Sequence, residues 1–258
     1  MIYILRKITF HIVFFLALIN CTNESKSLKI AAVFSDHMVL QQLSDVSFWG
    51  EGIPGQSVKI NSNWGESKIT VIDQSGNWMT TIKTPVYGGP YEIKIKSDTD
   101  EIKLKDVLVG EVWLASGQSN MEWPMSARII NQKQEIQNVN YTNIRMFSVP
   151  KNLNGTNINL ASWKLATPEN ILDFSAVGYF FAREVHNKLE VPVGIINSSW
   201  GGTRVEAWTS IEKLAEMTPS KKKAQEIILK GGVKGITTKK ALLNKKIILS
   251  NEAYLITK

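Results

Sequence analysis

Residues 107–125 read VLVGEVWLASGQSNMEWPM, and this stretch decides how the rest of the chain is arranged. The apolar run from Val107 to Leu114 ends abruptly at Ser116-Gly117, a pattern typical of a buried strand that enters a tight loop. In open α/β sheets, ligands bind outside the carboxyl ends of the strands. Ser119 therefore lies where a nucleophile would be presented, although a serine-rich loop that caps a following helix fits the same local sequence.

A second stretch, residues 191–208, reads VPVGIINSSWGGTRVEAW and has the same organisation. An apolar strand from Val193 to Asn197 breaks at the glycine pair Gly201-Gly202. Two such strand ends are expected to lie side by side in one parallel sheet. One end offers a hydroxyl group, and the other offers glycine N–H groups that no side chain obstructs, as an oxyanion hole requires.

The blocks GQSNMEWPM and SSWGGTRVEAW, with the opening FSDHMVLQ at residues 34–41, resemble the sialate O-acetylesterase family within the SGNH class of serine esterases. The resemblance covers residues 28–215. It implies an α/β protein with an N-terminal β-sandwich followed by a flavodoxin-like, three-layer α/β/α domain. It also implies that Ser119 is the nucleophile and that the oxyanion hole consists of the N–H group of Ser119 and one from Gly201 or Gly202.

The residue patterns independently predict this division of the chain. Residues 28–105 contain many short alternating segments separated by turn sequences, which is typical of a β-sandwich. In residues 106–220, strands alternate with helices, which predicts a parallel sheet with helices outside it. The expected elements after the Ser119 loop are a helix at 129–139, a strand at 144–149, a loop at 151–159 and a helix that begins at Asp173 or Ser175 and ends near Leu189.

The chemistry needed to activate a serine is missing from the sequence. A serine hydroxyl needs a positioned base, and the resemblance implies an Asp-x-x-His motif near the C-terminus of the family, which this chain lacks. His11 lies in the apolar leader, His37 opens the β-rich part and His186 lies on an outer helix, so none is expected to be the base. The hydrolase domain is thus predicted to be incomplete. A truncated or frameshifted coding region, a complementing C-terminal half on another chain, and a protein that no longer hydrolyses all remain open.

Five residues beside the two strand ends are candidates for binding a sugar substrate. Gln118 and Asn120 could hold the loop or donate hydrogen bonds to substrate oxygens. The indole rings of Trp123 and Trp200 could form a stacking floor for the sugar or belong to the core. The Arg204 guanidinium could pair with a sialic acid carboxylate or with a neighbouring glutamate.

The N-terminus predicts export from the cytoplasm. Residues 1–21 combine a positive start with an apolar run too short for a comfortable membrane span, which is typical of a signal peptide. Cys21 is the only cysteine and follows that run directly, as in a bacterial lipoprotein, although an ordinary secretory signal with an incidental cysteine also fits. The expected location is therefore secreted, periplasmic or cell-surface, with a possible outer-membrane lipid anchor at Cys21.

The basic character of the chain is concentrated at its end. Residues 221–258 hold ten lysines and two glutamates, a charge of +8, whereas the whole chain carries +7, so the rest sums to −1. A solvated lysine-rich tail explains this distribution, and no nucleic-acid partner is expected because basic and aromatic residues are not interleaved. One cysteine and three scattered histidines offer no metal-ligand spacing, and no cofactor is predicted.

The sequence thus favours a carbohydrate O-acetylesterase of the sialate type whose partner is an acetylated sugar. The isolated chain is expected to be inactive or incomplete because no base accompanies Ser119. Two alternatives remain open. One is a catalytically dead carbohydrate-binding protein that uses the tryptophans and the sandwich, and the other is an acetylxylan-type esterase, since related SGNH esterases share the GQSNM and GGT blocks.

Overall fold

The computed structural model describes residues 27–151, 161–217 and 221–229. The predicted signal segment with Cys21, most of the predicted loop at 151–159 and the residues beyond Leu229 lie outside the described residues. No helix in the described ranges is long and apolar enough to cross a membrane.

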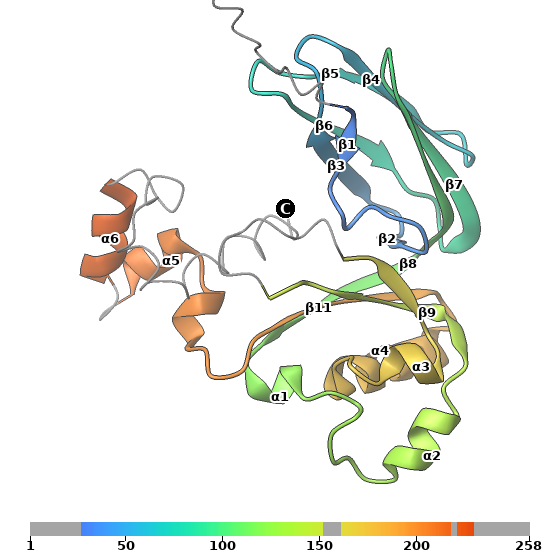
Figure 1. Ribbon diagram of the computed structural model, residues 1–258, viewed down its shortest axis with the longest axis vertical. Coiled ribbons are helices and arrows are strands. Elements are labelled where there is room, and N and C mark those ends of the chain that lie inside the picture. The colour runs from blue at the N-terminus through green and yellow to red at the C-terminus, as the bar shows by residue number, and fades with distance from the viewer. Residues whose placement is uncertain (1–26, 152–160, 218–220, 230–258) are drawn as a thin grey trace, which may run out of the picture.

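The first part of the chain is a β-sandwich, as predicted (Figure 1). One sheet has the order β1-β3-β6, and the facing strands β7, β4 and β5 belong to the larger sheet. Alternating side chains such as Phe48, Ile60 and Trp78 point between the sheets and are almost fully buried. The strands are β1 (Lys29–Ile30), β2 (Val39–Gln41), β3 (Asp45–Glu51), β4 (Ser57–Ser62), β5 (Ser67–Val71), β6 (Asn77–Lys83) and β7 (Gly88–Lys96).

Strand β8 (Glu101–Gly117) belongs to both parts of the molecule. Its first half pairs antiparallel with β7, and its second half pairs parallel with β11 (Val193–Ser199). The sequence patterns suggested two strands here, at 102–104 and from 107 onward, and the predicted domain boundary after residue 105 falls inside β8. The change of pattern arises because only Leu104 is buried before Val107, whereas residues 107–110, which pair with β7 and β2, are all buried.

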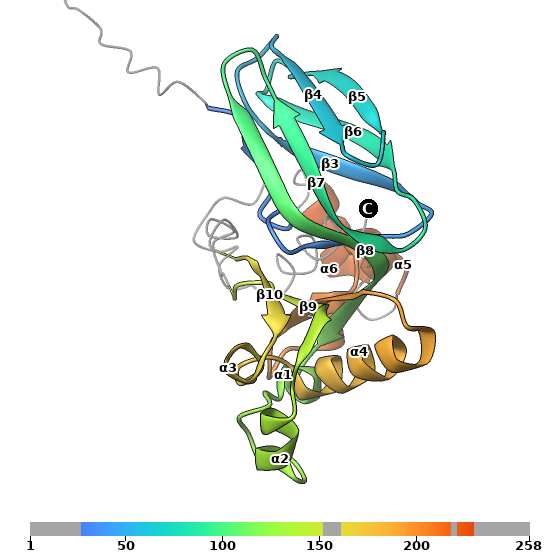
Figure 2. The ribbon, with the colours of Figure 1, turned by 90° about the vertical axis from the view of Figure 1, so that its right-hand side faces the viewer.

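The second part is a mixed α/β layer with the strand order β10-β9-β11-β8. Strands β9, β11 and β8 are parallel, and β10 is antiparallel to β9. Helices α1 to α4 lie on one face of this sheet (Figures 1 and 2). The remaining elements are β9 (Tyr141–Ser148), β10 (Trp163–Ala166), α1 (Ser119–Glu122), α2 (Gln132–Gln137), α3 (Pro168–Ile171), α4 (Ala176–Leu189), η2 (Val205–Trp208), α5 (Ile211–Glu216) and α6 (Lys221–Leu229).

Local sequence explains where the helices begin. The hydroxyl of Ser175 accepts a hydrogen bond from the Gly178 N–H at 2.9 Å, so Ser175 rather than Asp173 caps α4. Helix α4 then buries Tyr179 and Ala182 against β9 and β11. The helix predicted at 129–139 is shorter than expected, because Asn131 adopts a left-handed conformation and α2 starts only after it.

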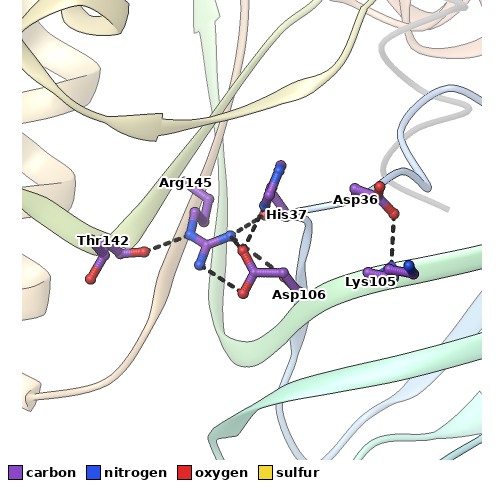
Figure 3. Close-up of polar contacts among 6 residues, drawn as sticks. All are labelled: Asp36, His37, Lys105, Asp106, Thr142 and Arg145. Carbon is purple, nitrogen blue, oxygen red and sulfur yellow. Dashed lines mark hydrogen bonds and ion pairs between the residues drawn. The ribbon is translucent and has the colours of Figure 1, made fainter.

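A buried ion-pair network ties the sandwich to the α/β layer (Figure 3). Arg145 on β9 is 3% exposed, and its guanidinium donates to both carboxylate oxygens of Asp106 on β8, at 2.7 and 3.2 Å. It also donates to the carbonyl oxygens of Thr142 at 2.6 Å and His37 at 3.2 Å. The His37 Nδ1 lies 2.6 Å from the same carboxylate. Four of these contacts join β8, β9 and the loop before β2 at one point, and the contact with Thr142 lies within β9.

The network also changes the acidity of Asp106. Partial burial pushes the pKa of its carboxyl group upward, but the hydrogen bonds and charges of Arg145 and His37 outweigh that effect, so the pKa lies below its ordinary value. A carboxyl group whose folded pKa is lowered contributes stability above its unfolded pKa and loses that contribution as the pH falls through the folded pKa.

We expect Asp106→Asn to lower the free energy of unfolding by about 2 kcal/mol at pH 6, because it leaves the buried Arg145 charge without its carboxylate. The difference from wild type should begin to shrink below about pH 4, where the carboxyl group of the unfolded wild-type chain becomes protonated, and should be lost as the pH falls through the lower pKa of the folded protein. Urea unfolding at pH 6, 4 and 3 measures this. The exposed Asp98→Asn is the control, and a difference for Asp106→Asn that is unchanged from pH 6 to pH 3 would contradict the assignment.

Candidate active site

Ser119 lies at the carboxyl end of β8, where the sequence placed it. The strand ends at Gly117, whose φ of 140° allows the turn, and Ser119 is the first residue of the short helix α1. Its side chain is exposed, and its hydroxyl donates to the Gln118 side-chain oxygen at 3.0 Å. The hydroxyl thus faces solvent at the edge of the sheet where ligands bind in this class of fold. Its role as a nucleophile stays a prediction.

The glycine turn after β11 lies directly beside Ser119. The parallel register pairs Ser199 with Gly117, and the Trp200 N–H donates to the Gly117 carbonyl oxygen at 2.9 Å. A β-carbon added to Gly201 would lie 3.7 Å from the α-carbon of Ser119. The register of two strands therefore brings together groups that are 82 positions apart in the sequence.

The N–H of Gly201 is not directed at open space. It donates to one carboxylate oxygen of Glu122, whose other oxygen contacts the Lys151 ammonium group. The predicted oxyanion-hole role of Gly201 therefore requires this carboxylate to move aside. Gly202 follows in the left-handed region with a φ of 73°. The oxyanion roles of both glycines remain predictions.

Sequence reasoning overlooked Glu122, although a signal was available. Glu122 follows Ser119 by three residues, so the two side chains share one face of α1. Its own N–H donates to the Gln118 carbonyl oxygen at 3.0 Å, which fixes the helix to the end of β8. Glu122 thus connects the candidate nucleophile, the glycine turn and the segment after β9.

The predicted sugar-binding residues lie next to Ser119 or to the glycine turn in the sequence. Gln118, Asn120 and Arg204 are exposed, and Arg204 directly precedes η2. The Trp123 side chain is 49% exposed, so the alternative that it belongs to the core is wrong, whereas Trp200 is half-buried. None of these positions shows what the residue binds, and their roles stay predictions.

A chain of hydrogen bonds holds the turn that carries Arg204. The Thr203 hydroxyl donates to the Trp200 carbonyl oxygen at 2.7 Å and accepts from the Trp208 indole at 2.8 Å. The turn after Gly202 is therefore fixed at both ends, which gives the exposed groups beside Ser119 a defined position.

Neither histidine in the described ranges lies at Ser119. His37 is held by Asp106, which precedes Gly117 by eleven residues on β8, or roughly 36 Å at the usual rise of a strand. The His186 Nδ1 lies 2.7 Å from the Val191 carbonyl oxygen, beside the opposite end of β11. The described part of the chain also contains no group of three or more His, Cys, Asp or Glu side chains that could hold a metal ion.

Comparison with known proteins identifies the family of this chain. A family profile described as "Carbohydrate esterase, sialic acid-specific acetylesterase" matches residues 109–236. The sialate O-acetylesterases of Mus musculus and Homo sapiens are each 33% identical to this chain over 204 and 203 residues, respectively, which is 70% of its length. The chain belongs to the sialate O-acetylesterase family.

A solved structure from the same enzyme class supports the fold of this family member. A carbohydrate acetylesterase from Xanthomonas citri superimposes with a TM-score of 0.67 at 34% sequence identity, over 76% of this chain and 45% of that one. The chain spans 37% of the mouse sialate O-acetylesterase and 39% of the human one. The Ser119 loop and the Gly201-Gly202 turn both fall within the residues that the family profile matches.

We expect Glu122→Ala to release the Gly201 N–H and to lower the free energy of unfolding by about 1 to 2 kcal/mol, because a charge-assisted hydrogen bond is lost. The amide proton resonance of Gly201 should move upfield, since the short bond to a carboxylate deshields that proton. Glu184→Ala on the exposed face of α4 is the matched control and should leave this resonance in place. An unmoved Gly201 resonance in Glu122→Ala would contradict the contact.

Proposed function

We propose that this chain carries the nucleophilic part of a carbohydrate O-acetylesterase of the sialate type, which removes acetyl groups from sugars. The observation that carries the proposal is the pairing of Ser199 with Gly117, which holds the exposed Ser119 hydroxyl beside the Gly201-Gly202 turn. A hydroxyl next to backbone N–H groups that can donate to the acyl oxygen is the arrangement that acyl transfer needs.

In the proposed reaction, the Ser119 oxygen attacks the acetyl carbonyl carbon and forms a tetrahedral intermediate. The negative oxygen accepts hydrogen bonds from the Ser119 N–H and from a glycine N–H, each worth about 3 kcal/mol of the barrier. For Gly201 to donate, the Glu122 carboxylate swings away toward Lys151, with which it is already paired. The sugar hydroxyl then leaves with the proton taken from Ser119, and water hydrolyses the acetyl-serine.

The proton transfers require a base from outside the described residues, because His37 and His186 are both engaged elsewhere. We propose that a complementing polypeptide carries this base together with its orienting acid. We further propose that residues 1–21 direct export and that Cys21 anchors the mature chain to a lipid surface, where acetylated glycans would be met.

The exposed groups around Ser119 suit a sugar ligand. Trp123 presents a half-exposed indole on which a pyranose ring can stack, and Gln118 and Asn120 can donate to its hydroxyl groups. Arg204 would pair bidentately with the carboxylate of a sialic acid. That contact would favour an acetylated sialoside over a neutral acetylated hemicellulose.

A catalytically dead carbohydrate-binding protein is the second candidate. The observation in its favour is that no imidazole in the described part of the chain lies near Ser119. This binding protein would hold a sugar on the same exposed surface around Ser119. A measurement of turnover therefore distinguishes it from the esterase, whereas a measurement of sugar binding does not.

We expect the full chain alone to show little or no hydrolysis of p-nitrophenyl acetate, since removing the base of a catalytic triad costs on the order of 10⁶ in turnover. Any residual activity should disappear in Ser119→Ala and persist in Ser126→Ala, which changes another exposed serine. Robust turnover by the wild-type chain that Ser119→Ala abolishes would mean that a base lies within this chain after all.

For substrate class, we expect Arg204→Ala to weaken binding of a 9-O-acetylated sialoside about tenfold, because a bidentate charge-assisted pair is lost. Binding of an acetylated xylo-oligosaccharide should be unchanged. Calorimetric titration of both ligands measures this, with Arg128→Ala as a control at another exposed arginine. Equal binding of the sialoside by wild type and Arg204→Ala, with tighter binding of the xylo-oligosaccharide, would favour the acetylxylan-type esterase.

A further inference from the structure

The Glu122 carboxylate on α1 joins two segments that follow the neighbouring strands β9 and β11. One oxygen accepts the Gly201 N–H in the turn after β11, and the other contacts the Lys151 ammonium group in the segment after β9. The Gly201 N–H is a group that the proposed reaction assigns to the oxyanion. A carboxylate of the protein therefore occupies the place of a ligand oxygen.

The contact depends on glycine at position 201. A β-carbon built there would lie 2.5 Å from the Glu122 carboxylate oxygen, which is closer than such atoms pack, and 3.7 Å from the α-carbon of Ser119. A β-carbon on Gly202 would meet no atom within 4 Å. The close approach is therefore specific to the first glycine of the pair. A ligand oxygen that replaced the carboxylate would lie beside Ser119.

The Glu122 side chain can leave Gly201 without a change in the backbone. The Glu122 N–H donates to the Gln118 carbonyl oxygen at 3.0 Å, so the backbone of α1 keeps its place when the side-chain torsions change. The Glu122 side chain is 28% exposed and that of Lys151 is 47% exposed, so water and small anions reach both. Because an ion pair open to solvent contributes little to stability, the carboxylate is held mainly by the Gly201 N–H.

The present occupant defines the class of ligand. A backbone N–H bonded to a carboxylate forms a charge-assisted hydrogen bond, which is stronger than a bond to a neutral carbonyl. An acetate ion offers the same pair of oxygens. A neutral ester carbonyl competes less well with Glu122 and becomes a strong acceptor only when negative charge develops on its oxygen.

We propose that the turn at Gly201 binds small free carboxylates, including the acetate that the proposed reaction releases, and that Glu122 competes with them for the same N–H. Lys151 is a positioning residue that retains the displaced Glu122 carboxylate and so makes room at Gly201. The competition rests on Gly201 and Glu122 alone, whereas its effect on turnover rests on the proposed function of Ser119.

Lys151 controls how readily the carboxylate is released. Its ammonium group offsets the charge of Glu122 and contacts the oxygen that does not bind Gly201. Rotation of the carboxyl group toward Lys151 frees the N–H and preserves the ion pair. Without the ammonium group, an incoming anion would meet the uncompensated like charge of Glu122.

The test is titration of the full chain with sodium acetate at constant ionic strength, followed through the amide proton resonance of Gly201, with sodium chloride as the reference salt. We expect Glu122→Ala to bind acetate about tenfold more tightly than wild type, with a downfield shift of that resonance on binding. Glu122→Gln, which keeps a neutral acceptor, should also bind acetate more tightly and serves if the alanine variant does not fold. Glu184→Ala, which removes the acidic member of an exposed ion pair on α4, should bind acetate like wild type.

A double-mutant cycle tests the role of Lys151. Lys151→Ala should weaken acetate binding about fivefold in the wild-type background but less than twofold in Glu122→Ala, because Lys151 acts through Glu122. A loss of equal size in both backgrounds would mean that Lys151 binds the anion itself and would overturn its positioning role. Lys188→Ala, which removes the basic member of the same α4 ion pair, should have no effect in either background.

The remaining outcomes separate the carboxylate site from the proposed function. A Gly201 resonance that responds to acetate no more than to chloride, or equal acetate affinity in wild type and both Glu122 variants, would overturn the carboxylate site. Acetate competition combined with no binding of the 9-O-acetylated sialoside would support the carboxylate site and reject the proposed function. Sialoside binding without acetate competition would overturn the carboxylate site and leave the proposed function in place.

Discussion

The structure depends on one strand that belongs to two sheets. β8 is 17 residues long, pairs antiparallel with β7 in the sandwich and then parallel with β11 in the α/β layer. Arg145, buried on β9, binds Asp106 in the part of this strand that pairs with β7 and so ties the sandwich to the α/β layer. Because the strand continues unbroken to Gly117, the position of Ser119 is set by the packing of the whole molecule rather than by its own loop.

The site at the end of β8 is assembled but occupied by the protein itself. The Glu122 carboxylate accepts the Gly201 N–H that the proposed reaction assigns to the oxyanion, and the positive charge of Lys151 lies beside that carboxylate. A carboxylate in this position keeps the glycine turn and α1 together without a ligand. In the proposed reaction, the contact between Glu122 and Gly201 would compete with the acyl oxygen for the Gly201 N–H. Because Lys151 pairs with Glu122, its position would affect both the stability of the glycine turn and the reactivity of the site.

The division of labour in the proposed enzyme follows from the same topology. The proposed nucleophile and the proposed backbone donors come from adjacent strand ends within this chain. The family profile covers both of these strand ends.

The sequence by itself determined the fold class, the helix that ends near Leu189 and the two strand ends, because alternation, capping and glycine breaks are local signals that survive without neighbours. It left the start of that helix open between Asp173 and Ser175. It even indicated that neither His37 nor His186 serves as the base. The sequence did not reveal that 102–104 and 107–117 form one strand, that Asn131 shortens α2, or that Trp123 is half-exposed. Only the tertiary structure decided the contacts of Glu122 with Gly201 and of Arg145 with Asp106, because residues 79 and 39 positions apart meet through strand register and burial, which no local pattern encodes.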